Sequence, residues 1–175
     1  MSRVPYLPEG LSVPAELVSS IRARRGGTLN HVDRLLLYCP PLAAGWNSLF
    51  LALRTQLELP ALYRELAICT VAALHGNEFE LGVHTPHFLN AGGTQRQLDA
   101  LRDPTNPHLK ASAFDALETA VLQIATACTH DVQIGEDAVR NFLELVPSER
   151  QLVELVSVVA AYNMAARFIS ALQIN

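Results

Sequence analysis

The segment from Tyr63 to His87 carries the densest set of side chains able to transfer protons or bind metals in this 175-residue chain. If residues 78–90 form a helix, Glu80 and His84 stand one turn apart and His87 follows on the same face. A carboxylate one turn from an imidazole is a ready proton-transfer pair, because it can hold the ring in one tautomer. The spacing therefore favours general acid–base chemistry, although the same pair is also common on solvated helix faces.

A second carboxylate, Glu65, lies on the preceding segment among mostly apolar neighbours. Burial of a carboxylate requires a partner, and a histidine on an adjacent antiparallel helix would supply one. We therefore expect Glu65, His84 and Glu80 to form one constellation.

The same residues allow a metal site, since Glu80, His84 and His87 are one carboxylate and two imidazoles, which bind zinc or iron. Pro86 is expected to disturb the turn that orients His87, and three ligands on one helix seldom satisfy tetrahedral geometry. We expect no metal and no cofactor. A metal-dependent enzyme stays as an alternative.

The three cysteines, Cys39, Cys69 and Cys128, are far apart and form no C-x-x-C pair. A disulfide framework is not indicated, and reduced thiols in a cytoplasmic protein are expected. Cys69 lies on an apolar helical segment, which is typical of a buried structural thiol.

Composition excludes several classes of protein. Half of the residues are apolar and 17% are charged, which excludes intrinsic disorder. The net charge of -4 argues against a nucleic-acid surface, and we expect the only basic cluster (Arg22, Arg24 and Arg25) to be a solvated helix end. Residues 35–53 lack charge, but Pro40 and Pro41 divide them into two soluble helices, so no membrane partner is expected.

Helical spacing recurs along almost the whole chain and no segment alternates with period two, which predicts an all-α protein. Proline, glycine and capping residues set the expected boundaries. The predicted helices cover 14–25, 29–38, 42–57, 60–74, 78–90, 94–101, 112–129, 135–145 and 148–172, with a linker at 102–110. The last of these is apolar over more than half its circumference, so we expect a homo-oligomer.

The run RELAICTVAALHGNEFELGVHTPHFLNAGGT resembles the carboxymuconolactone decarboxylase and alkylhydroperoxidase D-like proteins. The stretches PPLAAGWNSLFLALR and VVAAYNMAARF extend the resemblance over residues 30–172. It implies a single helical domain over 1–175, with 1–28 as an N-terminal extension, assembled as a homo-oligomer. It also implies that Glu65 and His84 are the family's characteristic glutamate and histidine.

The peroxidase branch of that family carries a C-x-x-C pair before the histidine, and here the two positions are Asn77 and Glu80. Neither residue can act as a thiolate nucleophile, which argues against cysteine-based peroxidase activity. The decarboxylase branch lacks the pair. Its resemblance implies cofactor-free acid–base chemistry on a small carboxylated or lactone-type substrate, with His84 as general acid beside Glu65 and Glu80.

An arginine is expected to bind the substrate carboxylates. The candidates are Arg167 and Arg34, with His87 also near the substrate, whereas Arg64 is expected to point away from the face that carries Glu65. A non-catalytic oligomer that binds a small acid is the remaining alternative.

Overall fold

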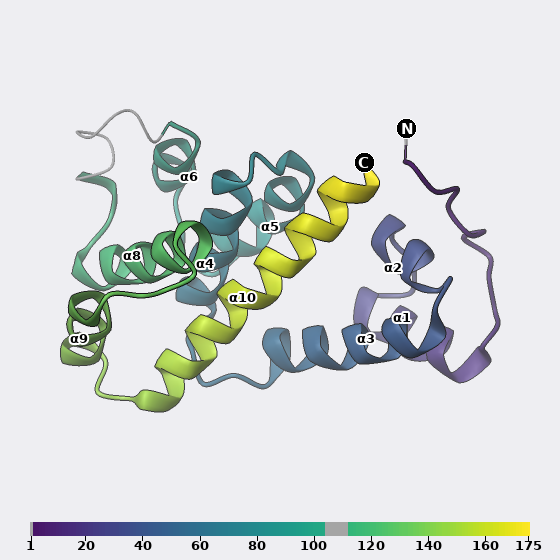
Figure 1. The fold of residues 1–175 in the computed structure, drawn as a ribbon, viewed down its shortest axis with the longest axis horizontal. Helices are drawn as coiled ribbons and strands as arrows, with labels where there is room; N and C mark the ends of the chain where they lie inside the picture. The colour runs from purple at the N-terminus through teal and green to yellow at the C-terminus, as the bar shows by residue number, and fades with distance from the viewer. Residues whose placement is uncertain (1, 104–111) are drawn as a thin grey trace. The chain divides into compact units, whose positions relative to one another are not determined.

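The computed structural model describes residues 2–103 and 112–175, and all regular structure within these ranges is helical, without a strand. The all-α prediction is therefore confirmed for the described residues. Figure 1 shows the helices, which are α1 (Ala15–Arg25), α2 (His31–Leu36), α3 (Pro40–Thr55), α4 (Ala61–Leu74), α5 (Glu78–Asn90), α6 (Gln95–Arg102), α8 (Ala116–His130), α9 (Glu136–Leu145) and α10 (Glu149–Leu172).

Local capping chemistry sets many of the helix boundaries. A capping box begins α6: Thr94 Oγ1 accepts from the Gln97 backbone N–H, and Gln97 Oε1 accepts from the Thr94 N–H. Asn77 caps α5, since its Oδ1 accepts from the Glu80 N–H at 3.1 Å. Gly26, with φ 76°, ends α1 in the left-handed region that glycine adopts without strain.

The predicted helix over 112–129 is interrupted at Phe114 and Asp115, and α8 begins only at Ala116. The reason is a capping box that the sequence reading overlooked, in which Asp115 and Glu118 exchange side-chain-to-backbone hydrogen bonds of 2.8 and 2.9 Å. The predicted linker at 102–110 lies mostly outside the described residues. The helix expected from residue 42 begins two residues earlier, at Pro40. Proline lacks a backbone N–H, and the first turn of a helix does not use that N–H for an intrahelical hydrogen bond.

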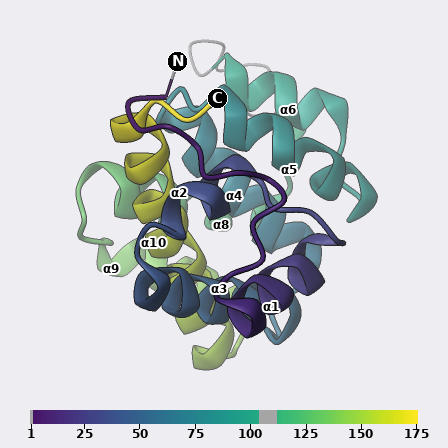
Figure 2. The ribbon, with the colours of Figure 1, turned by 90° about the vertical axis from the view of Figure 1, so that its right-hand side faces the viewer.

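The chain forms two compact units. The first extends to Gln56 and includes Phe168–Asn175. In it α1 and α2 pack against α3, and the N-terminal segment runs beside α2 (Figure 2). Tyr6 stacks on His31 with ring centroids 4.3 Å apart, which fastens this segment to α2.

The second unit, Leu57–Arg167, is built around α4, which packs against α5, α6 and α8. Every residue of α4 from Glu65 to Ala72 is buried, so this helix has no solvent face over two turns. The described part of α10 in this unit contributes the buried side chains of Leu155, Val158, Val159 and Tyr162. The positions of Glu65 and its neighbours are thereby fixed by core packing.

Among the described residues, α10 alone has the length and composition of a membrane-crossing helix, with a mean hydropathy of 1.5 over its most apolar 18-residue window. Half of that window is buried inside the protein. A buried core helix meets the same criteria.

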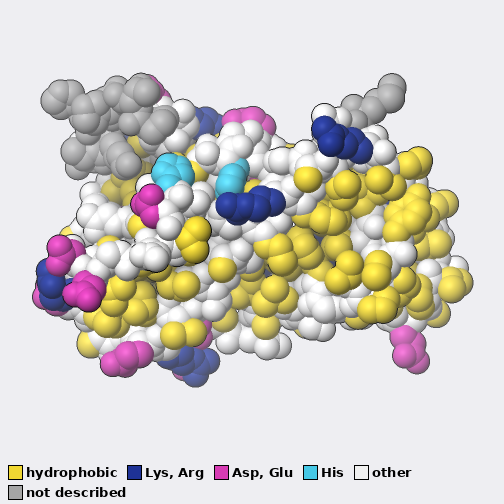
Figure 3. Space-filling model, in the orientation of Figure 1, with side chains coloured by type: hydrophobic (Ala, Val, Ile, Leu, Met, Phe, Trp, Pro, Cys, Tyr) yellow, Lys and Arg dark blue, Asp and Glu magenta, His cyan; other side chains and the backbone are white. Residues whose placement is uncertain are grey.

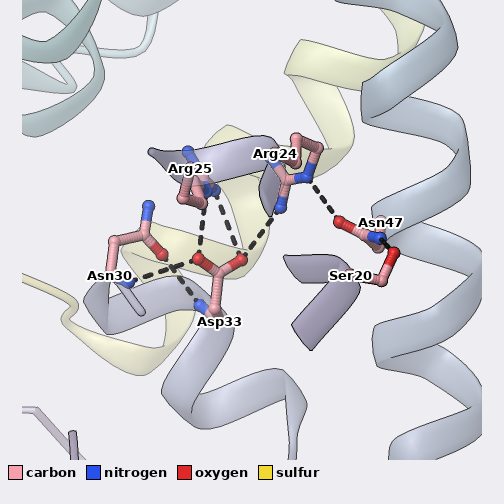
Figure 4. A network of polar contacts seen from close by, with 6 residues as sticks. All are labelled: Ser20, Arg24, Arg25, Asn30, Asp33 and Asn47. Atoms are coloured by element: carbon pink, nitrogen blue, oxygen red, sulfur yellow. Dashed lines mark hydrogen bonds and ion pairs between the residues drawn. The ribbon is translucent and has the colours of Figure 1, made fainter. Parts of the chain in front are cut away.

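The expectation that Arg24 and Arg25 form a solvated helix end is wrong. Both bind the buried carboxylate of Asp33 on α2, with nitrogen–oxygen distances of 3.1 and 3.0 Å (Figure 4). Arg24 also donates to Asn47 Oδ1 on α3, and the Asn47 amide donates to Ser20. This network joins three helices of the first unit, and burial, followed by the charge of Arg25, lowers the pKa of Arg24.

We expect Asp33→Ala to lower the free energy of unfolding by about 3–5 kcal/mol, because it leaves two largely buried guanidinium groups without their carboxylate. Asp137→Ala is the matched control, since it removes the carboxylate of an exposed ion pair with Arg140 and is expected to cost less than about 1 kcal/mol. Urea denaturation measures both. Equal losses in the two variants would contradict the structural role of Asp33.

Candidate active site

The candidate site lies within the second unit, where α4 and α5 pack side by side. Glu65, on α4, is 2% exposed, and the residues that follow it, Leu66 and Ala67, have no exposed surface. An ionised carboxylate in such a place is stable only with partners that satisfy its oxygens. The structure provides one partner for each oxygen.

The first partner is His84 on α5, whose Nδ1 lies 2.7 Å from Glu65 Oε2. His84 is itself 2% exposed. On the other side of its ring, Nε2 lies 3.7 Å from Glu80 Oε2, which is within ion-pair range but long for a direct hydrogen bond. The structure thus brings together Glu65, His84 and Glu80, the three residues that the sequence grouped.

The protonation of this pair follows from the state of Glu65. Burial alone would raise the pKa of the Glu65 carboxyl, but the hydrogen bond and charge of His84, together with Arg64, outweigh it, so the pKa lies below its ordinary value. An ionised carboxylate can only accept hydrogen bonds, so Nδ1 of His84 carries the hydrogen. Nε2 is then the ring nitrogen that faces Glu80.

The second partner of Glu65 corrects an expectation. Arg64 was expected to point away from Glu65, yet its Nε lies 3.2 Å from Glu65 Oε1. Adjacent residues on a helix project their Cβ atoms about 100° apart, but a long arginine side chain can fold back around the helix. The sequence places Arg64 directly before Glu65, but the direction of the two Cβ atoms alone did not predict the contact.

Two aromatic rings flank His84. The Tyr162 ring, from α10, meets it edge-on with centroids 5.0 Å apart, and the His87 ring lies 5.8 Å away. Tyr162 was not among the residues expected at the site. The expected disturbance at Pro86 is absent, since α5 continues through it to Asn90, and His87 is exposed.

The two arginines expected to bind substrate have other contacts. Arg167 donates from Nη1 to the backbone oxygen and Oδ1 of Asn163, at 3.1 and 3.0 Å. Arg34 belongs to the first unit, where it donates to the Leu7 carbonyl and lies 5.1 Å from the Tyr6 ring centre. Their roles toward a substrate stay predictions.

Within residues 2–103 and 112–175, no group of three His, Cys, Asp or Glu side chains has the arrangement of a metal site. The grouping of Glu80, His84 and His87 is therefore not such a group in these ranges. Nδ1 of His84 donates to Glu65, and its Nε2 faces a Glu80 carboxylate oxygen at 3.7 Å.

Thiol chemistry also has little support. Cys69 has no exposed surface, and burial followed by the charge of Glu65 raises its pKa to about 12, so it is protonated at neutral pH. Asn77 serves as the cap of α5, and its buried Nδ2 has no hydrogen-bond partner among the described residues.

Comparison with known proteins agrees with this fold. The sequence model of the carboxymuconolactone decarboxylase family matches residues 40–127, half of the chain. An uncharacterised peroxidase-related protein from Silicibacter sp. TM1040 matches with a TM-score of 0.81 and 16% identity, over 99% of this chain and 91% of that one. A protein of unknown function from Agrobacterium tumefaciens, described as a candidate antioxidant defence protein AhpD, matches with a TM-score of 0.71 and 14% identity, over 81% of this chain and 94% of that one.

No curated protein matches the chain significantly. At these levels of identity the two solved structures establish the helical fold and leave the chemistry to the side chains of this chain.

The lowered pKa of Glu65 predicts a pH-dependent contribution to stability. The native carboxyl binds its proton less tightly than the unfolded chain, so the contribution is complete above the ordinary pKa of 4.5 and is lost as the pH falls through the native value. We expect the difference in unfolding free energy between wild type and Glu65→Gln to shrink on acidification below that pH. Urea titrations over a pH series test this, with Glu78→Gln, at an exposed position on α5, controlling for the lost charge. A difference that grows on acidification would contradict the assignment.

Proposed function

Because this chain belongs to the carboxymuconolactone decarboxylase family, we propose that it catalyses cofactor-free acid–base chemistry on a small carboxylated or lactone-type substrate. The observation that supports the proposal is the line of Glu65, His84 and Glu80, in which one imidazole lies between two carboxylates at 2.7 and 3.7 Å. Such an arrangement fixes a tautomer and presents one ring nitrogen for proton transfer.

In this mechanism His84 is the general acid. Loss of CO2 breaks the bond between the carboxylate carbon and the ring carbon, and the electron pair delocalises into the unsaturated lactone carbonyl. A proton from Nε2 of doubly protonated His84 then forms the new C–H bond and leaves a neutral ring. Glu65 stabilises the positive charge of the imidazolium before transfer and holds Nδ1–H afterwards. Glu80, beside Nε2, assists the return of a proton from solvent.

A thiol peroxidase is less well supported, because the reaction needs an accessible thiolate and Cys69 is a buried thiol. A metal-dependent reaction at Glu80, His84 and His87 has less support, because within residues 2–103 and 112–175 no group of three such side chains has the arrangement of a metal site. A binding protein without turnover would retain the same constellation, and the turnover measurement described below distinguishes it.

We further propose that the protein acts in the cytoplasm as a homo-oligomer. Figure 3 shows hydrophobic side chains gathered over the right-hand part of the view, where α1, α2 and α3 lie. Leu42 and Leu49, two turns apart on α3, are 64% and 41% exposed. A second copy of the chain would cover such a face.

We expect light scattering coupled to gel filtration to give a mass that is a multiple of 19.1 kDa, because exposed leucines on one helix face favour self-association. Leu42→Asp should lower that mass, whereas Gln133→Asp, on the exposed turn after α8, should leave it unchanged. A wild-type protein that elutes as a monomer would reject this proposal.

The experiment that tests the catalytic proposal is CO2 release from 4-carboxymuconolactone. We expect His84→Ala and Glu65→Ala to lower turnover by roughly 100- to 10,000-fold, the range for loss of general acid–base catalysis. Glu80→Gln should have a smaller effect, since it removes an assisting group.

The matched controls are Glu78→Gln, two residues from Glu80, and His130→Ala at the exposed end of α8. Both should retain wild-type turnover. Full activity of His84→Ala would reject the mechanism, and wild-type protein that binds the substrate without turnover would favour the binding role.

A further inference from the structure

Arg64 retains hydrogen-bonding capacity that its contact with Glu65 does not use. The guanidinium donates a hydrogen bond from Nε to Glu65 Oε1, which leaves the edge formed by its two terminal nitrogens unused. Its terminal nitrogens, Nη1 and Nη2, make no hydrogen bond to any residue in the described ranges. The side chain is 16% exposed, and neither terminal nitrogen is among the fully buried unpaired atoms of the described residues, so this second edge is accessible to a ligand.

The charges around the site indicate which kind of ligand this edge of the guanidinium would bind. Glu65 and Glu80 both contribute carboxylates, so an anionic substrate approaching His84 would meet two like charges. The guanidinium of Arg64 is the cation in direct contact with this constellation within the described part of the chain. An arginine with two parallel N–H groups binds a carboxylate in bidentate fashion, more strongly and with more defined geometry than a lysine.

We propose that Arg64 is the residue that selects a carboxylated substrate, by holding one carboxylate on its Nη1–Nη2 edge while its Nε stays on Glu65. This inference rests on the proposed function, since it names the anchor of the same site. Arg64 therefore connects the substrate and the general acid through a chain of four groups: substrate carboxylate, guanidinium, Glu65 and imidazole.

The bound carboxylate is the one that stays on the product. An ion pair stabilises the charge of a carboxylate, whereas a departing carboxylate must disperse its charge as CO2 forms, so a strong contact to the leaving group would oppose the reaction. The substrate class that fits is an acid with two carboxylates, one held by Arg64 and one placed beyond it, near His84 Nε2.

The test uses glutarate, a saturated dicarboxylate that cannot lose CO2 by this route, and glutaramide, its neutral counterpart. Binding is measured by isothermal titration calorimetry, and the location by the NMR signals of the His84 ring. We expect glutarate to bind wild type and shift those signals. Its Kd should rise by about 10- to 100-fold in Arg64→Lys and Arg64→Gln, which is the effect of losing charge-assisted hydrogen bonds.

Arg140→Lys, at an exposed arginine of α9, is the matched control and should leave the Kd for glutarate unchanged. Glutaramide should bind all variants alike. The proposal is overturned if glutarate does not bind wild type, if its Kd is unchanged in the Arg64 variants, or if glutaramide loses as much affinity as glutarate. Thermal melting identifies any variant that fails to fold, and Arg64→Lys, which keeps the charge beside Glu65, then decides.

With 4-carboxymuconolactone, Arg64→Lys should raise KM more than it lowers kcat, whereas a purely structural role for Arg64 would lower kcat without selecting between charged and neutral ligands. Failure of this inference is separate from failure of the proposed function. Glutarate binding that depends on Arg64, combined with full turnover by His84→Ala, would reject the acid–base mechanism alone.

Discussion

The hydrogen bond between Glu65 and His84 is the interaction on which the functional part of the structure depends. It places a carboxylate at 2% exposure inside the core of the second unit, where only an ionic partner makes the charged form stable. The bond spans two helices, so its length is set by how α4 packs against α5. The hydrophobic residues that surround Glu65 on α4 are therefore as necessary to the site as the polar groups, because they fix the distance at which the proton is held.

The chain positions these groups with simple local devices. Pro60 precedes α4 five residues before Glu65, and Asn77 caps α5 three residues before Glu80, so both helices begin within two turns of the site. Glu80 and His84 then share a face by the helical repeat. Arg64, the residue before Glu65, donates a hydrogen bond to the remaining carboxylate oxygen of Glu65. Two successive helices thus supply the imidazole, both carboxylates and the guanidinium of the candidate site.

The geometry of the candidate site was largely predictable from sequence, because helical periodicity places Glu80 beside His84, and Glu65 among apolar neighbours needs a polar partner on an adjacent helix. The helix boundaries followed in the same way from proline, glycine and capping residues such as Thr94. Contacts that depend on side-chain length or on distant helices were not predictable. Arg64 reaches Glu65 because its side chain bends back, Arg24 and Arg25 are buried because Asp33 on another helix receives them, and Tyr162 meets His84 from α10. These contacts depend on packing, which a single sequence read by periodicity does not contain.

The exposure of the three acid–base groups gives the site a direction. The side chains of Glu65 and His84 are each 3% exposed, whereas that of Glu80 is 13% exposed, so Glu80 is the most solvent-exposed of the three groups. Arg64 also touches solvent, but its guanidinium carries only hydrogen-bond donors and lies on the far side of Glu65 from the imidazole. In the mechanism that we propose, solvent protons therefore reach the imidazole from the Glu80 side. On that proposal, Glu80 governs how quickly the imidazole regains its proton after each reaction.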